Sequence, residues 1–99
     1  ITGVRLKNAV TGEKQEIACD GVFVSVGREP ETRMIENQVT LDEKGYIIAD
    51  ESTKTNLPGV FAVGDIRTKA LRQIVTAAAD GANAAYATEE YLANWAKNN

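Results

Sequence analysis

The chain has 99 residues, enough for one small domain at most, with an apolar fraction of 43% that is ordinary for a globular protein. Its net charge of −3 offers no basic surface for nucleic acid and no attraction to an anionic membrane, and no apolar run is long enough for a span. One cysteine and no histidine exclude an internal disulfide, a histidine-activated nucleophile and a histidine-ligated metal. We therefore expect no metal, nucleic-acid or membrane partner, and a reducing cytoplasmic setting.

The first quarter of the chain predicts β-strands. Val4 and Leu6 alternate with charged neighbours, which is typical of a half-buried strand. A turn signal follows, and residues 16–19 predict the return strand of a hairpin. The β-branched and aromatic run at residues 22–26 predicts a strand that is covered on both faces.

Shorter elements are predicted in the middle of the chain. Residues 31–37 favour one or two helical turns. Residues 39–41 and 46–49 could pair as short strands across the polar turn at residues 42–45. The polar stretch at residues 50–56 predicts a surface loop.

A short apolar run at residues 60–63 predicts a strand that stops at Gly64-Asp65. Such a strand places a carboxylate at the carboxyl edge of a sheet, where open α/β sheets bind their ligands. Gly64 would let a ligand approach the backbone, and Asp65 would accept hydrogen bonds from ligand hydroxyls such as those of a ribose or ribityl chain. The alternative is an ordinary turn or N-cap aspartate.

A long alanine-rich helix is predicted to begin at Arg72-Gln73-Ile74. Its start would offer unpaired N–H groups and a partial positive charge to an electron-rich ligand atom. Apolar residues recur at helical spacing and predict the buried face: Ile74, Ala78, Ala82, Ala85, Leu92 and Trp95. Small residues also form a stripe, which we interpret as close packing against a sheet rather than a cofactor contact: Ala77, Ala78, Gly81, Ala82 and Ala85.

Several other residues have ordinary structural interpretations. Cys19 has no partner at C-x-x-C spacing and is interpreted as a structural cysteine. Arg28 is interpreted as a solvated arginine, with a position at a domain junction as the alternative. Tyr86, Tyr91 and Trp95 are interpreted as packing or interface residues.

The stretch from residue 55 to 65, TNLPGVFAVGD, resembles the second FAD motif of the flavoprotein disulfide reductases. Within that family, residues 72–81 (RQIVTAAADG) are similar to the low-molecular-weight thioredoxin reductases. Residues 20–30 are similar to the segment by which the family's nicotinamide domain returns to its FAD domain. The resemblance covers essentially the whole chain. Because the family's two G-x-G-x-x-G fingerprints and its C-x-x-C pair are absent, the resemblance predicts a C-terminal fragment of a longer enzyme.

This resemblance implies an α/β fold: a partial, three-layer, Rossmann-like FAD/NAD(P)-binding fold with a β-rich first half and a C-terminal helix. Residues 1–27 would end the nicotinamide-binding domain, and residues 28–99 would form the C-terminal part of the FAD-binding domain. It implies no catalytic residue here, and these cofactor-binding residues: Gly64, Asp65, Arg72, Gln73 and Ile74. The backbones of Gln73 and Ile74 would meet the pyrimidine edge of the flavin, and Arg72 would lie near the ring or the phosphates.

The implied parent enzyme passes electrons from NADPH through FAD to a dithiol and on to thioredoxin, as a homodimer. Related activities share this part of the fold and stay open: the flavoprotein subunit of alkyl hydroperoxide reductase, ferredoxin-dependent thioredoxin reductase and ferredoxin–NADP reductase. The 99-residue chain is expected to be inactive alone. A different class of function also stays open, namely a non-catalytic module that self-associates, as a dimer or by swapping.

Overall fold

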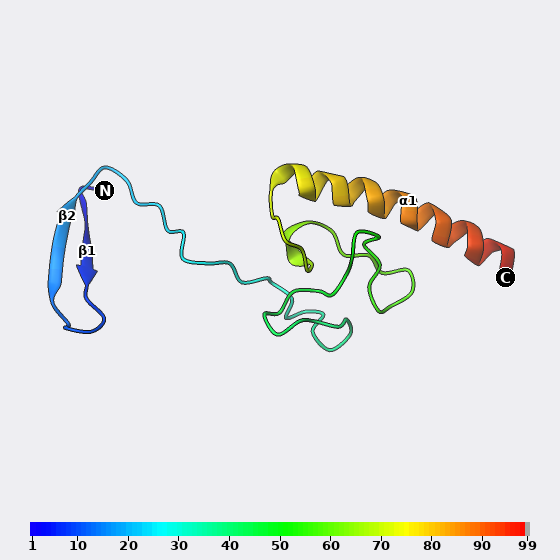
Figure 1. Cartoon of the computed structure of the whole chain (residues 1–99), viewed down its shortest axis with the longest axis horizontal. Helices are drawn as coiled ribbons and strands as arrows, with labels where there is room; N and C mark the ends of the chain where they lie inside the picture. Colours follow the sequence, from blue (N-terminus) through cyan, green and yellow to red (C-terminus); the bar gives the residue numbers. More distant parts are fainter. Residues whose placement is uncertain (99) are drawn as a thin grey trace.

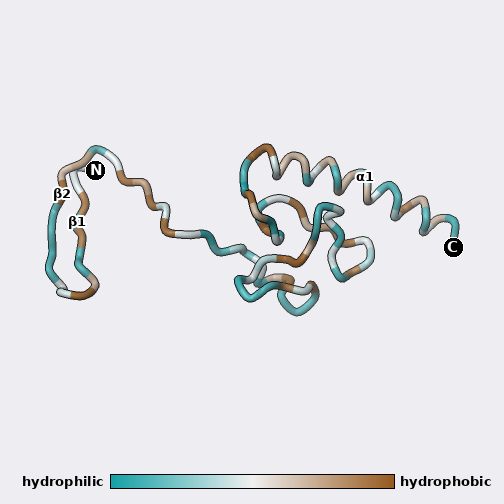
Figure 2. The backbone as a smooth tube through the Cα atoms, viewed as in Figure 1, coloured by the Kyte–Doolittle hydropathy of each residue, from teal (hydrophilic) through white to brown (hydrophobic). Residues whose placement is uncertain are grey.

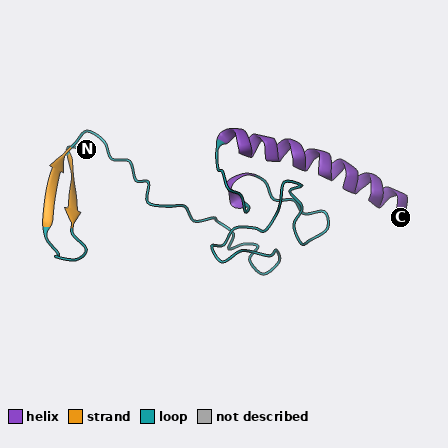
Figure 3. Cartoon of the chain, in the orientation of Figure 1, coloured by secondary structure: helices purple, strands orange, loops and turns teal. Residues whose placement is uncertain are grey.

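The computed structural model describes residues 1–98; Asn99, which the sequence predicts at a polar chain end, lies outside the described residues. Its regular elements are β1 (Gly3–Lys7), β2 (Lys14–Ala18), the 3-10 turn η1 (Gly64–Ile66) and the helix α1 (Ile74–Asn98). Loops make up most of the chain between β2 and α1 (Figure 3). The molecule is elongated, 67 × 27 × 21 Å, because the β1–β2 hairpin stands apart at the end of an extended connection (Figure 1).

The predicted hairpin is confirmed. β1 and β2 pair antiparallel, with Val4 opposite Ile17. The side chain of Asn8 closes the turn by accepting two backbone N–H groups at 2.8 and 3.1 Å. The expected half-burial is confirmed for Val4 but wrong for Leu6, which remains exposed. Cys19 follows β2 as a partly buried free thiol.

The strand predicted at residues 22–26 is absent. This connection is extended, but none of the described residues pairs with it as a strand. Phe23 is 100% exposed and Val26 is 92% exposed, and Figure 2 shows apolar residues along this isolated stretch. A buried strand needs a neighbouring strand to hydrogen-bond with and other elements to pack on its faces, and these come from residues distant in the sequence. The pattern identified an apolar, extended segment correctly, but the described chain supplies no partner for it.

The rest of the chain folds around one small core. The buried residues are Val39, Ile47, Ala49 and Ala62, and partly buried neighbours pack against them: Ile35, Leu41, Leu57 and Ile66. Ile47 joins two segments, because it bridges antiparallel to Leu41 and parallel to Arg67. Its N–H donates to the carbonyl of Ile66 at 3.0 Å, and its own carbonyl accepts the N–H of Thr68 at 2.8 Å. The predicted pairing across the polar turn is confirmed as the antiparallel bridge between Leu41 and Ile47.

Two other local predictions are wrong in part. Residues 31–37 form hydrogen-bonded turns rather than helix, with the N–H of Ile35 donating to the carbonyl of Thr32 at 3.0 Å. The strand predicted at residues 60–63 is reduced to one antiparallel bridge between Lys54 and Phe61. A short apolar segment needs flanking strands to become a sheet, and residues 60–63 have no such neighbours among residues 1–98. Residues 31–37 are too few for a stable helix without packing along one face.

The predicted helix is confirmed as α1, but its buried face differs from the predicted one. Asp80 and Ala87 are the buried residues of α1. The predicted face is exposed, and the small-residue stripe with it except for Ala77, which is half-buried. A Cβ added at Gly81 would meet no heavy atom within 4 Å, so this glycine meets no packing demand here. The apolar periodicity did not predict the buried face of α1, because the helix contacts the preceding loops through the carboxylate of Asp80 and not through an apolar stripe.

Candidate functional site

The segment from residue 64 to 69, here called the Gly-Asp corner, turns the chain from the core toward α1. Gly64 has a φ of +76°, in the left-handed region that favours glycine. A Cβ there would lie 3.7 Å from the Cβ of Ala77, which is ordinary contact. The backbone conformation, rather than a lack of room, therefore requires glycine at the start of the corner.

Asp65 presents its carboxylate to solvent, with a side chain that is 50% exposed. Its Oδ2 accepts a hydrogen bond from Nη1 of Arg28 at 3.1 Å. Arg28 is exposed too, as a solvated arginine would be, but the fold brings it to the predicted ligand-binding carboxylate. An exposed pair of this kind contributes at most about 1 kcal/mol, so a ligand hydroxyl can compete for Asp65.

Arg72 braces the corner instead of projecting away from it. Its guanidinium carbon lies 3.9 Å from the centroid of the Tyr46 ring, a cation–π contact. Its Nε donates to the carbonyl of Asp65 at 3.2 Å, and its Nη2 donates to the carbonyl of Arg67 at 3.2 Å. The structure thus places Arg72 between Tyr46 and the backbone of Asp65.

The start of α1 lies next to the corner. The N–H of Gln73 donates to Oγ1 of Thr76 at 3.1 Å and is therefore used within the helix cap. The first helical bond runs from the N–H of Ala77 to the carbonyl of Gln73 at 3.0 Å. The N–H groups of residues 74–76 consequently lack an intrahelical acceptor. Of the two predicted backbone donors, the amide of Ile74 therefore has no acceptor within α1, whereas the amide of Gln73 is bonded within the cap.

A buried ionic cluster, here called the Asp80 network, lies beneath the corner. The Oδ2 of Asp80 accepts hydrogen bonds from the backbone N–H of Gly64 at 2.8 Å, from Nε of Arg67 at 2.8 Å and from Nζ of Lys69 at 2.7 Å. Its Oδ1 accepts Nη2 of Arg67 at 2.7 Å. One carboxylate therefore joins α1 to both ends of the corner.

Arg67 extends this network to the loop before the corner. Its side chain is 1% exposed, and it donates to the carboxylate of Glu51 at 3.0 Å and to the carbonyl of Ala49 at 3.3 Å. Hydrogen bonds from Arg67 and then Lys69, stronger than the opposing effect of burial, hold the pKa of Asp80 well below its usual range. The bond to Asp80 likewise raises the pKa of the Arg67 guanidinium.

The sequence interpretation missed the Asp80 network. Asp80 stands as a lone carboxylate among alanines and a glycine, and two cations at alternate positions, Arg67 and Lys69, follow Asp65 closely. A carboxylate on the apolar half of a helix is rarely left unpaired when buried. That was the available signal, although no sequence spacing indicates which cation it meets.

Acid should weaken the fold through Asp80. A pKa that is lower in the folded chain stabilises it fully above the ordinary carboxyl pKa of about 3.9, and this stabilisation is lost as the pH falls toward the folded value. We expect the urea midpoint to fall steadily below about pH 4. Asp50, whose pKa the hydroxyl of Ser52 lowers, adds a contribution of the same sign. The double variant Asp80→Leu/Lys69→Met should show a shallower decline, and an unchanged decline would contradict this assignment.

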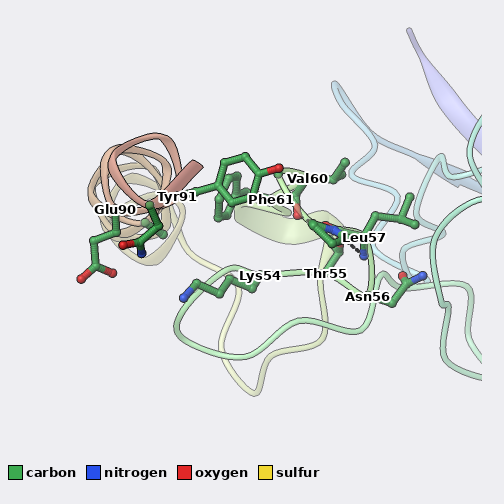
Figure 4. A pocket seen from close by; sticks show the side chains of 12 residues that line it. Lys54, Thr55, Asn56, Leu57, Val60, Phe61, Glu90 and Tyr91 are labelled. Atoms are coloured by element: carbon green, nitrogen blue, oxygen red, sulfur yellow. Dashed lines mark hydrogen bonds between the residues drawn. The ribbon is translucent and has the colours of Figure 1, made fainter. Parts of the chain in front are cut away.

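Three cavities are relevant to ligand binding. Two open ones, of about 400 and 530 Å³, flank the corner and share Arg28 and Tyr46; the first also includes Asp65 and the second Arg72. A third, of about 320 Å³, lies between the loop at residues 54–61 and the second half of α1 (Figure 4). None of the predicted cofactor residues lines this third cavity.

The third cavity is shaped by aromatic packing. Tyr91 reaches from α1 toward Phe61, and the two rings meet edge to face at 6.5 Å (Figure 4). This contact confirms a packing role for Tyr91, whereas Tyr86 is 65% exposed. Across residues 1–98, no helix is long and apolar enough to cross a membrane, and no cluster of acidic residues or cysteine could hold a metal ion.

Residues 2–81 match the family model described as pyridine nucleotide-disulphide oxidoreductase. The chain therefore belongs to this family. Its α/β class, a partial Rossmann-like FAD/NAD(P)-binding fold, agrees with the sequence prediction and with its structural neighbours.

The particular relatives are thioredoxin reductases. The chain is 50% identical over 92 residues to the thioredoxin reductase of Peptoclostridium acidaminophilum, covering 87% of this chain and 29% of that protein. It is 46% identical over 94 residues to that of Streptomyces clavuligerus, covering 94% and 29%. It matches the crystal structure of Lactococcus lactis thioredoxin reductase with a TM-score of 0.75 and 43% identity, covering 94% and 31%. The predicted resemblance is confirmed, and the chain spans less than a third of the length of these relatives.

Proposed function

We propose that this chain supplies half of the FAD site of an NADPH-dependent flavoenzyme that reduces the disulfide of thioredoxin. The observation that carries the proposal is the Gly-Asp corner, where Asp65, with its half-exposed carboxylate, belongs to a turn that contacts α1 near its open start. The thioredoxin reductase relatives support it. In this proposal residues 1–27 end a nicotinamide-binding domain and residues 28–99 complete an FAD-binding domain of a cytoplasmic homodimer.

The residues of the corner fit such a cofactor. Gly64 has no side chain to keep a ligand from the backbone, and the carboxylate of Asp65 accepts ribityl hydroxyls. The N–H groups from Ile74 to Thr76 have no intrahelical acceptor and, with the helix dipole, favour an electron-rich edge. Arg72 and Gln73 hold the corner and the helix start in place. Bound FAD would supply the electron-transfer chemistry, while these residues bind and orient it.

Removing the carboxylate of Asp65 should weaken FAD binding by the chain. The test is a titration of the 99-residue chain with FAD, followed by flavin fluorescence and the visible absorption band. We expect saturable binding that is roughly 10- to 100-fold weaker in Asp65→Ala, because the ribityl hydroxyls lose a charged acceptor worth about 1.5–3 kcal/mol. Glu89→Ala is the matched control, since Glu89 is an exposed acid on α1 away from the corner.

Two results would count against the proposal. Equal FAD affinity of Asp65→Ala and the unchanged chain would remove Asp65 from the site. NADPH-dependent disulfide reduction by the chain alone would contradict the half-site, because a single cysteine cannot form the dithiol that the reaction requires.

A second candidate function, self-association, is favoured by the bare connection at residues 22–26. Phe23 is fully exposed, and both edges of this extended segment lack a strand partner among the described residues. Unpaired apolar strands are templates for pairing with another chain. Two copies of the chain can therefore bury this segment against one another, by pairing or by swapping.

Concentration-dependent light scattering decides this second candidate. We expect the mass to rise from one chain toward two as concentration increases, and Phe23→Ser/Val24→Thr to shift that rise to higher concentration. Val10→Thr is the control, because Val10 is 95% exposed, much like Phe23, but lies in the hairpin turn and not in the segment at residues 22–26. A monomer at all accessible concentrations would exclude self-association.

A further inference from the structure

We infer that Asp80 is the positioning residue of the Gly-Asp corner and that it thereby sets the geometry of the ligand site without touching the ligand. Its Oδ2 holds the backbone N–H of Gly64, the residue immediately before Asp65, at 2.8 Å. The same atom holds Lys69 at the far end of the corner at 2.7 Å. The part of this inference that concerns FAD rests on the proposed function.

The bond from Gly64 is distinct from the charge balance of the network. Arg67 and Lys69 already give the carboxylate two cationic partners, so a backbone amide adds nothing to charge neutralisation. It does fix the position of the carboxylate relative to the chain turn. Asp80 is 2% exposed, which prevents water from taking over this role.

The Gly64 anchor controls more than one residue of the site. A glycine can populate many backbone conformations, and the bond to Asp80 selects the left-handed one at φ +76°. That choice directs the carboxylate of Asp65. It also places the two carbonyls, of Asp65 and Arg67, to which Arg72 donates. Loss of the anchor should therefore loosen Asp65 and Arg72 together.

The experiment separates anchoring from charge pairing with three variants of the 99-residue chain. Lys69→Met is the reference, because it removes one cation and leaves both Asp80 and its bond to Gly64. Asp80→Leu/Lys69→Met removes the acceptor of the Gly64 N–H and one of the two buried cations. Arg67 then keeps Glu51 as its ion-pair partner. Asp80→Glu keeps the negative charge but moves the carboxylate away from the N–H of Gly64. The flexible side chains of Arg67 and Lys69 can shift to keep their ion pairs with it.

Two measurements are made on each variant. Amide hydrogen exchange by NMR reports the Gly64 anchor, with the amide of Ile47, bonded to Ile66, as the internal control for global folding. FAD titration reports the ligand site. Relative to Lys69→Met, we expect the double variant to exchange the Gly64 amide about 10- to 100-fold faster, over and above the acceleration that global destabilisation gives the Ile47 amide. We also expect it to bind FAD about 10- to 100-fold more weakly. Asp80→Glu should behave like the double variant.

Each outcome is decisive. Unchanged Gly64 exchange in both Asp80 variants overturns the inference, and so does unchanged FAD affinity despite a freed amide. If the double variant does not fold, Asp80→Glu decides alone. If the unchanged chain binds no FAD, the proposed function fails for this chain, and the exchange of the Gly64 amide still decides the anchoring role.

Discussion

Arg67→Met should lower the free energy of unfolding by about 3–5 kcal/mol, which is the cost of leaving a buried ion pair with one partner missing. The substitution keeps the length and apolar volume of the side chain. It leaves Asp80 with Lys69 as its remaining cation and frees the bonds that Arg67 makes to Glu51 and Ala49. For a chain of 99 residues, whose whole stability is about 5–15 kcal/mol, such a loss is severe.

Urea unfolding of the unchanged chain and of Arg67→Met measures this difference in the free energy of unfolding. Arg28→Met is the matched control, because the same substitution there removes an exposed ion pair and should cost less than about 1 kcal/mol. A loss at Arg67 no larger than the loss at Arg28 would show that the Asp80 network does not hold α1 against the corner.

Gly59→Ala should destabilise the chain by about 1–3 kcal/mol, the second large effect. Gly59 has a φ of +79°, and a left-handed residue with a Cβ costs roughly 1–2 kcal/mol. The added Cβ would also lie 3.0 Å from Cε1 and 3.1 Å from Cζ of Tyr91. That ring is packed edge to face on Phe61, so it cannot move away without losing contact.

The same substitution at Gly81 should have the opposite sign. Gly81 lies within α1 and an added Cβ meets open space, so Gly81→Ala should stabilise the chain by about 1 kcal/mol through helix propensity. Thermal or urea unfolding of both variants compares the two signs directly. Stabilisation by Gly59→Ala would contradict the tight approach of Tyr91, and destabilisation by Gly81→Ala would show that this face of α1 is covered in solution.

Local patterns gave reliable elements. The alternation at Val4 and Leu6, with the turn signal that follows it, predicted the hairpin, and the alanine-rich run after Arg72 predicted α1. The Gly64-Asp65 pair was predicted to end a strand and present a carboxylate at a sheet edge; the structure has an exposed carboxylate at a turn there, without the sheet. These features depend on neighbours close in sequence, whose backbone preferences are set by residue type.

Non-local features were predicted poorly, for one shared reason. The strand at residues 22–26 and the apolar face of α1 were both inferred from hydrophobicity. Hydrophobicity indicates that a residue favours burial, but it does not identify the segment that packs against that residue. Within the described chain that cover is missing, so Phe23 and Ile74 lie in solvent. The Asp80 network was missed because its partners come from three separate segments.

The sequence by itself therefore determined the family, the hairpin, α1 and the identity of the corner residues, because motif and propensity are properties of short stretches. Only the tertiary structure decided which face of α1 is buried, that Arg28 reaches Asp65, and that Asp80 holds Gly64. Each of these is a contact between residues far apart in the chain. Such a contact forms where packing and charge neutralisation together outweigh desolvation, and that balance depends on how the segments are arranged in space.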